Sequence, residues 1–233
     1  MPYGKRIYLR REMPDPALVK AFEELPAANV ADVMNRSSAM DSRIRLISAP
    51  RKKCVCGPAL TVKCRAGDNL TLHAAMDLAE EGDFLVVSNE GDDSRSLMGA
   101  IMTAYLSLQK KAAGIVLDGP VRDVDALSQW DFPVYATGST PGGPYKEGPG
   151  EINVPVSIGG ISVLPGDLIL ADPDGIVVIP RKEAAEILNA ARASHVKDEQ
   201  SLQDALQGTA ERSWVSEKIT EKEYEIIDGC WRP

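Results

Sequence analysis

Aromatic residues are scarce in this chain, at 5% of 233 residues, and histidine occurs only twice. Hydrophobic residues still make up 44% of the sequence, so we expect a sizeable core built mainly from aliphatic side chains. No run of about 18 apolar residues occurs, which argues against a transmembrane helix and a membrane partner. The first residues lack the apolar segment of a secretory signal, so we expect a cytoplasmic location.

Cysteine is also sparse, and its spacing does not suit a zinc knuckle. Only one residue separates the first two of the four cysteines. A protein without a secretory signal is expected to stay in a reducing compartment, where disulfides are uncommon. We therefore interpret all four as structural thiols: Cys54, Cys56, Cys64 and Cys230.

The two histidines, His73 and His195, are too few for a histidine-based metal site. His73 falls in a helical pattern, and we expect it to be packed or at the surface rather than a ligand. The formal net charge is −8, and this acidic balance disfavours nonspecific binding to nucleic acid. It leaves protein partners possible.

Residues 15–207 read as one α/β domain, between an N-terminal arm at 1–14 and a C-terminal helical tail at 208–233. Apolar segments predict strands at 59–63, 84–88 and 114–117, and we expect an irregular connection at 37–58. A charged amphipathic pattern predicts a long helix over 181–206, which could protrude and pack on another subunit.

The second half of the domain is rich in strand signals. Short apolar segments at 152–156, 161–163, 168–171 and 176–179 alternate with glycine- and proline-containing turns. This spacing predicts a β-meander or a small barrel layer. The preceding loop, 137–150, lacks the order of a phosphate-binding P-loop, and we interpret it as a rigid loop that borders a site or a subunit interface.

Residues 99–125 hold the strongest candidate site. The predicted strand at 114–117 ends in an Asp-Gly-Pro turn that presents Arg122 and Asp123. In layered α/β proteins, ligands collect at the carboxyl ends of strands. Arginine offers a planar fork for a carboxylate, and aspartate offers a hard oxygen for Mg²⁺ or Mn²⁺. The alternative is that both residues are ordinary solvated turn charges.

Two helix starts could contribute to the site. Gly99 opens a predicted helix whose first backbone N–H groups could hold a carboxylate or phosphate, although Gly99 could equally serve close packing. Asp32 lies in another predicted short helix, where an acid commonly stabilises the helix end.

Two sequence blocks resemble one protein family. The segment LDGPVRDVD resembles the DG-x-VRD signature shared by the regulator of ribonuclease E activity A and the class II 4-hydroxy-4-methyl-2-oxoglutarate / 4-carboxy-4-hydroxy-2-oxoadipate aldolases. The segment TGSTPGGPYKEGPGEINVPVSIGGISVLPGDLILADPDGIVVIP resembles the glycine- and proline-rich block that follows it in this family. The resemblance implies an RraA-like, swivelling β/β/α-type core and a homotrimer or hexamer with sites at subunit interfaces.

The aldolase branch implies a role for particular residues here. Arg122 would bind the 2-keto acid and stabilise its enolate, and Asp123 would hold Mg²⁺ or Mn²⁺. Backbone amides at about Gly99, Ala100, Ile101 and Met102 would hold the pyruvyl carboxylate. Glu199 of a neighbouring subunit is the nearest match to a glutamate that acts close to the metal.

The chain departs from the aldolase pattern at one position. That pattern has an acid 21 residues before the arginine, and here the position is Ile101. A retro-aldol step needs a base for the substrate hydroxyl, for which a metal-bound water or Asp32 is available. Oxaloacetate decarboxylation needs only the stabilised enolate, so we expect it to survive where aldol cleavage does not.

These features predict a metal-dependent lyase that cleaves a 4-hydroxy-4-methyl-2-oxoglutarate-like keto acid to pyruvate and decarboxylates oxaloacetate. The first alternative is a non-catalytic regulator that binds a protein partner such as ribonuclease E. The second is an enzyme on the same scaffold with a different small acidic substrate. The regulator branch commonly lacks the aspartate after the arginine, so Asp123 favours an enzyme, whereas Ile101 argues against the standard aldolase.

Overall fold

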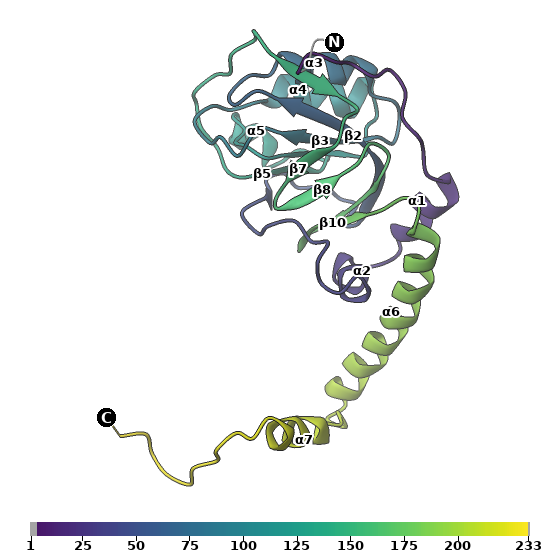
Figure 1. The fold of residues 1–233 in the computed structure, drawn as a ribbon, viewed down its shortest axis with the longest axis vertical. Helices are drawn as coiled ribbons and strands as arrows, with labels where there is room; N and C mark the ends of the chain where they lie inside the picture. The colour runs from purple at the N-terminus through teal and green to yellow at the C-terminus, as the bar shows by residue number, and fades with distance from the viewer. Residues whose placement is uncertain (1–3, 233) are drawn as a thin grey trace. The chain divides into compact units, whose positions relative to one another are not determined.

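A sheet of short, buried strands forms the centre of residues 4–193 in a computed structural model, which describes residues 4–232 (Figure 1). The strands follow the order β1-β5-β4-β3-β2-β9-β10, and β6 pairs with β2. Strands β2 to β5 are mutually parallel, whereas β1, β6, β9 and β10 pair antiparallel. The sheet strands are β1 Arg45–Leu46, β2 Val55–Cys64, β3 Phe84–Ser88, β4 Gly114–Leu117, β5 Val134–Ala136, β6 Gly150–Ile152, β9 Leu168–Asp172 and β10 Gly175–Ile179.

Each face of the parallel strands is covered by a different layer. One face packs on α3 (Leu70–Leu78), α4 (Ala100–Ala104), the π-helix η1 (Tyr105–Gln109) and α5 (Val124–Leu127). The other face packs on β9, β10 and a separate antiparallel hairpin, β7 (Val156–Ile158) and β8 (Ile161–Val163). The expected α/β fold with a β/β/α layered core and a β-rich second half is confirmed.

A third apolar cluster lies over β9 and β10. It includes α1 (Pro16–Phe22), α2 (Ala27–Val33) and the beginning of α6 (Ala184–Leu206). Asp15 begins α1 as predicted, because its side chain accepts a hydrogen bond from Ala17 N–H at 2.8 Å. Phe22, at the end of α1, is fully buried in this cluster.

The described part of the N-terminal arm, residues 4–14, contacts the domain through paired charges. Arg6 pairs with the buried Glu151, and Arg11 pairs with the buried Asp83. Tyr8 N–H donates to the Ile152 carbonyl at 3.2 Å, so the arm adds backbone pairing beside β6. Residues 1–3 of the expected arm lie outside the described residues.

Two expectations for the strands were wrong. The segment 37–58 is not irregular throughout, because β1 occupies part of it and β2 begins at Val55 rather than 59. Gly57 lies inside β2 where a side chain would overlap the Gly82 carbonyl, so packing rather than a turn requires this glycine. The segment 152–156 is also not one strand: β6 ends at Ile152, β7 starts at Val156, and Asn153 between them has φ +55°.

Residues 194–232 form a separate unit that contains the rest of α6 and the helix α7, Ser213–Glu221. No described residue of α7 is buried, and Trp214 is 62% exposed. The unit boundary falls within α6, whereas the sequence placed the end of the domain at 207. Within residues 4–232, no helix combines the length and the apolar character needed to cross a membrane.

Candidate active site

The loops that leave four parallel strands build one cavity of about 330 Å³. Asn69 follows β2, residues 96–99 follow β3, Arg122 and Asp123 follow β4, and Lys146 follows β5. Because these strands are parallel, their carboxyl ends meet at one edge of the sheet, which is where α/β proteins place ligands. The sheet topology therefore brings together residues that are up to 77 positions apart in the sequence.

Backbone hydrogen bonds hold the turn after β4 on both sides. Val121 N–H donates to the Gly138 carbonyl, and Arg122 N–H donates to the Met98 carbonyl, each at 3.0 Å. Asp123 follows in the left-handed conformation, with φ +61° and ψ +36°, and it precedes the first residue of α5. Aspartate adopts this conformation more readily than most residues. The backbone of the turn that carries Arg122 and Asp123 is thus held by the loops after β3 and β5.

Gly99 is the point where the chain before α4 approaches this turn. A methyl group on Gly99 would overlap Asp123 Oδ2 and lie 2.9 Å from Arg122 Cγ. The same Asp123 oxygen accepts a hydrogen bond from Ala100 N–H at 3.0 Å. The structure therefore shows that Gly99 serves close packing, and that Asp123 already engages the first amide of α4.

Arg122 and Asp123 remain accessible at the cavity. Their side chains are 47% and 44% exposed, and Arg122 Nε lies 3.9 Å from Asp123 Oδ2. A half-exposed pair at this distance contributes little to stability. Both charges can therefore contact a ligand without the loss of a strong internal ion pair.

Most of the predicted substrate-binding residues line this cavity. They are Gly99, Ile101, Met102 and Arg122, together with the predicted metal ligand Asp123. Ala100 is joined to the group through its hydrogen bond to Asp123. Ile101 is 83% exposed, which leaves an apolar side chain at the position where the aldolase pattern has an acid.

The two other predicted residues are not part of this cavity in the described chain. Asp32 lies on α2, which packs on β9 and β10 rather than at the carboxyl ends of β2 to β5. It pairs with Arg36 at 2.9 Å across one helical turn. Glu199 belongs to the unit 194–232 and lies 3.6 Å from His195. Its predicted role involved a neighbouring subunit, so a single chain does not test it.

The sequence analysis missed several cavity residues, and three of them have side chains that could act on a ligand: Asn69, His73 and Lys146. We interpreted His73 as a packed or surface residue, and the structure places it half-buried on α3, one turn after Asn69, in the lining of the cavity. Burial lowers the pKa of His73, and the nearby Lys146 lowers it further, whereas Asp77 opposes the shift. The spacing of Asn69 and His73, four residues apart at a helix start, was the available signal, since such residues share a face.

Asn69 also has a buried side-chain atom without a hydrogen-bond partner among the described residues. Its Nδ2 donates to the Leu97 carbonyl at 2.7 Å, but its buried Oδ1 has no hydrogen-bond partner among the described residues. A buried acceptor without a donor is costly unless a water or a ligand supplies one. The hydrogen bond from Nδ2 therefore fixes the Asn69 side chain to the loop after β3, while its buried Oδ1 lacks a donor among the described residues.

The donor set fits a weakly held divalent cation. No cluster of three or more histidine, cysteine, aspartate or glutamate residues occurs among residues 4–232. Among the described lining residues, Asp123 alone offers a carboxylate to this cavity. Mg²⁺ commonly binds through one or two carboxylates, waters and substrate oxygens, so a single aspartate beside a half-exposed arginine suits this mode.

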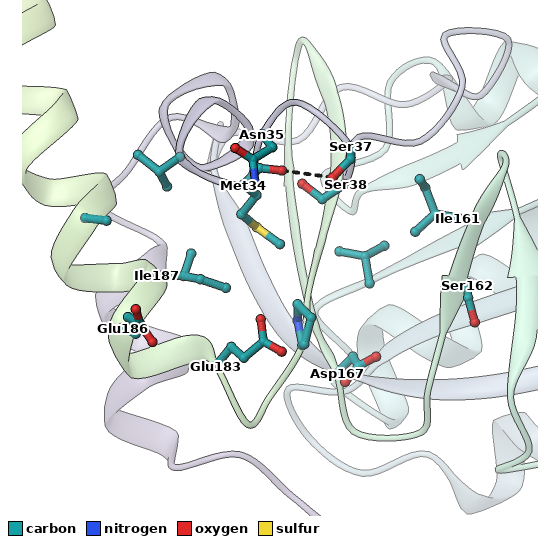
Figure 2. A pocket seen from close by; sticks show the side chains of 14 residues that line it. Met34, Asn35, Ser37, Ser38, Ile161, Ser162, Asp167, Glu183, Glu186 and Ile187 are labelled. Atoms are coloured by element: carbon teal, nitrogen blue, oxygen red, sulfur yellow. Dashed lines mark hydrogen bonds between the residues drawn. The ribbon is translucent and has the colours of Figure 1, made fainter.

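A larger cavity of about 550 Å³ lies elsewhere in residues 4–193, and Figure 2 shows its lining. Its wall includes apolar residues such as Met34, Ile161 and Ile187. The carboxylates of Asp167, Glu183 and Glu186 also line it, and none of the described residues around it is lysine, arginine or histidine. Three like charges without a cation would repel a keto acid, so the smaller cavity is the better candidate.

Comparisons with known proteins place the chain in a family. Residues 27–178 match the family model described as RraA-like: Aldolase/RraA. The chain belongs to the RraA-like family. A relative from Halalkalibacterium halodurans, named "Putative 4-hydroxy-4-methyl-2-oxoglutarate aldolase", is 34% identical over 181 residues, which cover 78% of this chain and 85% of the relative.

Solved structures of the RraA-like family share the fold. Streptomyces coelicolor RraAS2, described as an unusual member of the RNase ES inhibitor RraA protein family, is 31% identical with a TM-score of 0.73. The match covers 82% of this chain and 98% of that one. The RNA-processing inhibitor RraA from Thermus thermophilis is 28% identical with a TM-score of 0.59, over 66% and 92% of the two chains.

Proposed function

We propose that this chain is a divalent-metal-dependent lyase that cleaves a 4-hydroxy-2-keto acid, such as 4-hydroxy-4-methyl-2-oxoglutarate, to pyruvate and also decarboxylates oxaloacetate. The observation that carries the proposal is the position of Arg122 and Asp123 side by side in the cavity at the carboxyl ends of the parallel strands. The name of the Halalkalibacterium halodurans relative supports the same reaction class.

The chain's own residues would bind and polarise the substrate. The guanidinium of Arg122 would donate charge-assisted hydrogen bonds to the keto oxygen, where negative charge develops as the carbon–carbon bond breaks. Amides at Ile101 and Met102, which follow the amide engaged by Asp123, would hold the substrate carboxylate. Mg²⁺ or Mn²⁺ bound at Asp123 would supply Lewis-acid stabilisation of the same oxygen.

The proposal includes assembly into a homotrimer or hexamer, which would bring Glu199 of a neighbouring chain toward the site. Exposed apolar side chains on the described arm and on α7 support an assembly, among them Leu9 at 73% and Trp214 at 62% exposure. Light scattering on purified protein measures the mass directly. A monomer at micromolar concentration would contradict this part of the proposal.

Oxaloacetate decarboxylation tests the proposed function. We expect turnover by the purified protein, loss with EDTA, and recovery with added Mg²⁺ or Mn²⁺. Arg122→Ala and Asp123→Ala should each reduce kcat/KM by at least about 100-fold, since the first removes a contact to the developing charge and the second removes the proposed metal ligand. Arg51 and Asp131 form an exposed pair outside the cavity at 3.5 Å, so Arg51→Ala and Asp131→Ala are matched controls. Turnover that resists EDTA, or survives both cavity substitutions, would refute the proposal.

A non-catalytic regulator remains the second candidate, because two of the solved relatives are described as inhibitors of RNA processing or of RNase ES. In that case the chain would bind a ribonuclease E-type protein through its surface. Copurification with such a protein, together with no metal-dependent turnover, would favour this candidate. The presence of Asp123 beside Arg122 is what favours the lyase.

A further inference from the structure

We propose that His73 is the acid–base residue of the retro-aldol step, where it takes the proton of the substrate's C4 hydroxyl. The inference rests on the proposed lyase function and addresses the base of the reaction. The sequence offered a metal-bound water or Asp32 for this role, and Asp32 does not line the cavity. The inference starts from the position of His73 in the cavity that also holds Arg122 and Asp123. At position 101, where the aldolase pattern has an acid, the cavity has an isoleucine.

The other titratable groups of the cavity are unsuited to accept this proton. Among the described lining residues, these groups are Arg122, Asp123 and Lys146. Arg122 and Lys146 are cations and have no lone pair to offer. Asp123 accepts the Ala100 N–H and is the cavity's sole carboxylate for a cation. His73 is the remaining group that is both basic and uncommitted to the enolate.

The surroundings of His73 keep its imidazole neutral and therefore able to accept a proton. Half-burial on α3 is the main cause that lowers its pKa, and Lys146 from the loop after β5 adds to it. Asp77, one turn further along α3, opposes the shift. Arg122 and Asp123 face the same cavity from the turn after β4, with opposite charges. A base that is neutral near pH 7 has the protonation state that general base catalysis needs.

Asn69 lies beside His73 in the lining of the cavity. The two residues lie one helical turn apart, and both line the cavity. The buried Oδ1 of Asn69 lacks a donor among the described residues, although Nδ2 is fixed on the Leu97 carbonyl. Asn69 is therefore a neighbour of His73 on this wall of the cavity whose position is fixed by the loop after β3.

The retro-aldol cleavage needs no reactant other than the substrate and the imidazole of His73. The imidazole of His73 takes the C4 hydroxyl proton, and the oxygen's electron pair forms the C4 carbonyl. The C3–C4 bond breaks, and its electron pair forms the C2–C3 double bond of pyruvate enolate, whose oxygen is held by Arg122. The imidazolium then returns the proton to C3, which gives pyruvate and the second carbonyl product.

The test compares two reactions in the same variant. Retro-aldol cleavage of 4-hydroxy-4-methyl-2-oxoglutarate needs the base, whereas oxaloacetate decarboxylation does not. We expect His73→Gln to lower kcat for cleavage by at least about 100-fold, while decarboxylation stays within about threefold of wild type. Deuterium exchange at the pyruvate methyl group, followed by NMR, should fall together with cleavage.

A second variant tests the role without removing the imidazole. Asp77→Asn removes a carboxylate that raises the pKa of His73, so the acid limb of the pH profile of kcat/KM for cleavage should move to lower pH. The side chain of Asp77 accepts a hydrogen bond from Tyr105 Oη at 3.0 Å, which asparagine can retain. Thermal melting of both variants identifies any loss of fold.

Each outcome decides the proposal. Selective loss of cleavage in His73→Gln with the expected shift in Asp77→Asn supports it. Cleavage within about threefold of wild type in His73→Gln, an equal loss of both reactions, or an acid limb that does not move in Asp77→Asn overturns it and leaves the lyase proposal standing. A wild-type protein that decarboxylates oxaloacetate but cleaves no hydroxy-keto acid overturns the role of His73 together with the cleavage part of the proposed function, and leaves the decarboxylase part standing. A wild-type protein without oxaloacetate turnover overturns the proposed function, and the role of His73 with it.

Discussion

Asp123 accepts a hydrogen bond from the backbone N–H of Ala100 at 3.0 Å, and this bond joins the turn after β4 to the first turn of α4. The helix start and the paired charges, which lie at opposite ends of the candidate segment 99–125, are therefore in direct contact. In our proposal this contact also determines which amides are left for the substrate. A change in the position of Asp123 should thus alter both metal binding and carboxylate binding.

Gly99→Ala tests the close approach between these segments. The new methyl group would overlap Asp123 Oδ2 and crowd Arg122 Cγ, so we expect both side chains to move. A displacement of about 1 Å at a catalytic group can cost roughly 100-fold in rate. We therefore expect kcat/KM for metal-dependent oxaloacetate decarboxylation to fall about 10- to 100-fold, with little change in Tm.

Gly138→Ala is the matched control for this substitution. A methyl group there meets no atom within 4 Å among the described residues, and Gly138 is not part of the cavity lining. Its activity should match that of wild type. Equal activities in the two glycine variants would show that the contact between Gly99 and Asp123 is not required.

Glu151→Gln tests how the N-terminal arm is attached. Glu151 is 2% exposed and accepts a hydrogen bond from Arg6, which lowers its pKa below the ordinary 4.5 although burial opposes this. A lowered folded-state pKa means that the stabilisation is present above about pH 4.5 and is lost as the pH falls through the folded-state pKa. At pH 7 we expect the free energy of unfolding to decrease by about 1–3 kcal/mol.

Urea denaturation at pH 7, 5, 4 and 3 measures this dependence. The difference between wild type and Glu151→Gln should shrink as the pH falls below about 4.5. Glu217→Gln, a change at an exposed glutamate on α7, should show no such difference. A constant gap for Glu151→Gln from pH 7 to pH 3 would contradict the role of its charge.

Thiol reactivity should separate the four cysteines. Burial raises the pKa of Cys64 to about 12 and that of Cys54 to about 11, and it raises the pKa of Cys56 still more strongly. Cys230 is exposed. Because the thiolate is the reactive form, the Cys230 thiol should react quickly with a disulfide reagent at pH 8, whereas the other three should react slowly. All four thiols should react in denaturant. Cys230→Ser should remove the fast phase; a fast phase that survives would mean that the fold opens near β2.

The sequence predicted the strands well where apolar runs are bounded by turn residues. The limits of β3 and β4 agree with the prediction because each is a short, fully buried run between charged or glycine-containing loops. The start of β2 was missed because Gly57 and Pro58 normally mark turns. They lie within a strand here because β2 is paired with β9, and the backbone of Gly82 comes too close to Gly57 for any side chain.

The paired charges after β4 were determined by local sequence, since a short strand and a stiff turn necessarily present Arg122 and Asp123 at a strand's carboxyl end. Their neighbours depend on which strands pair in parallel, and this is a property of the whole sheet. Only the tertiary structure therefore brought His73, Asn69 and Lys146 to the same cavity and placed Asp32 outside it. The physical reason is that hydrophobic periodicity specifies which face of an element is buried, whereas long-range strand pairing decides which loops meet.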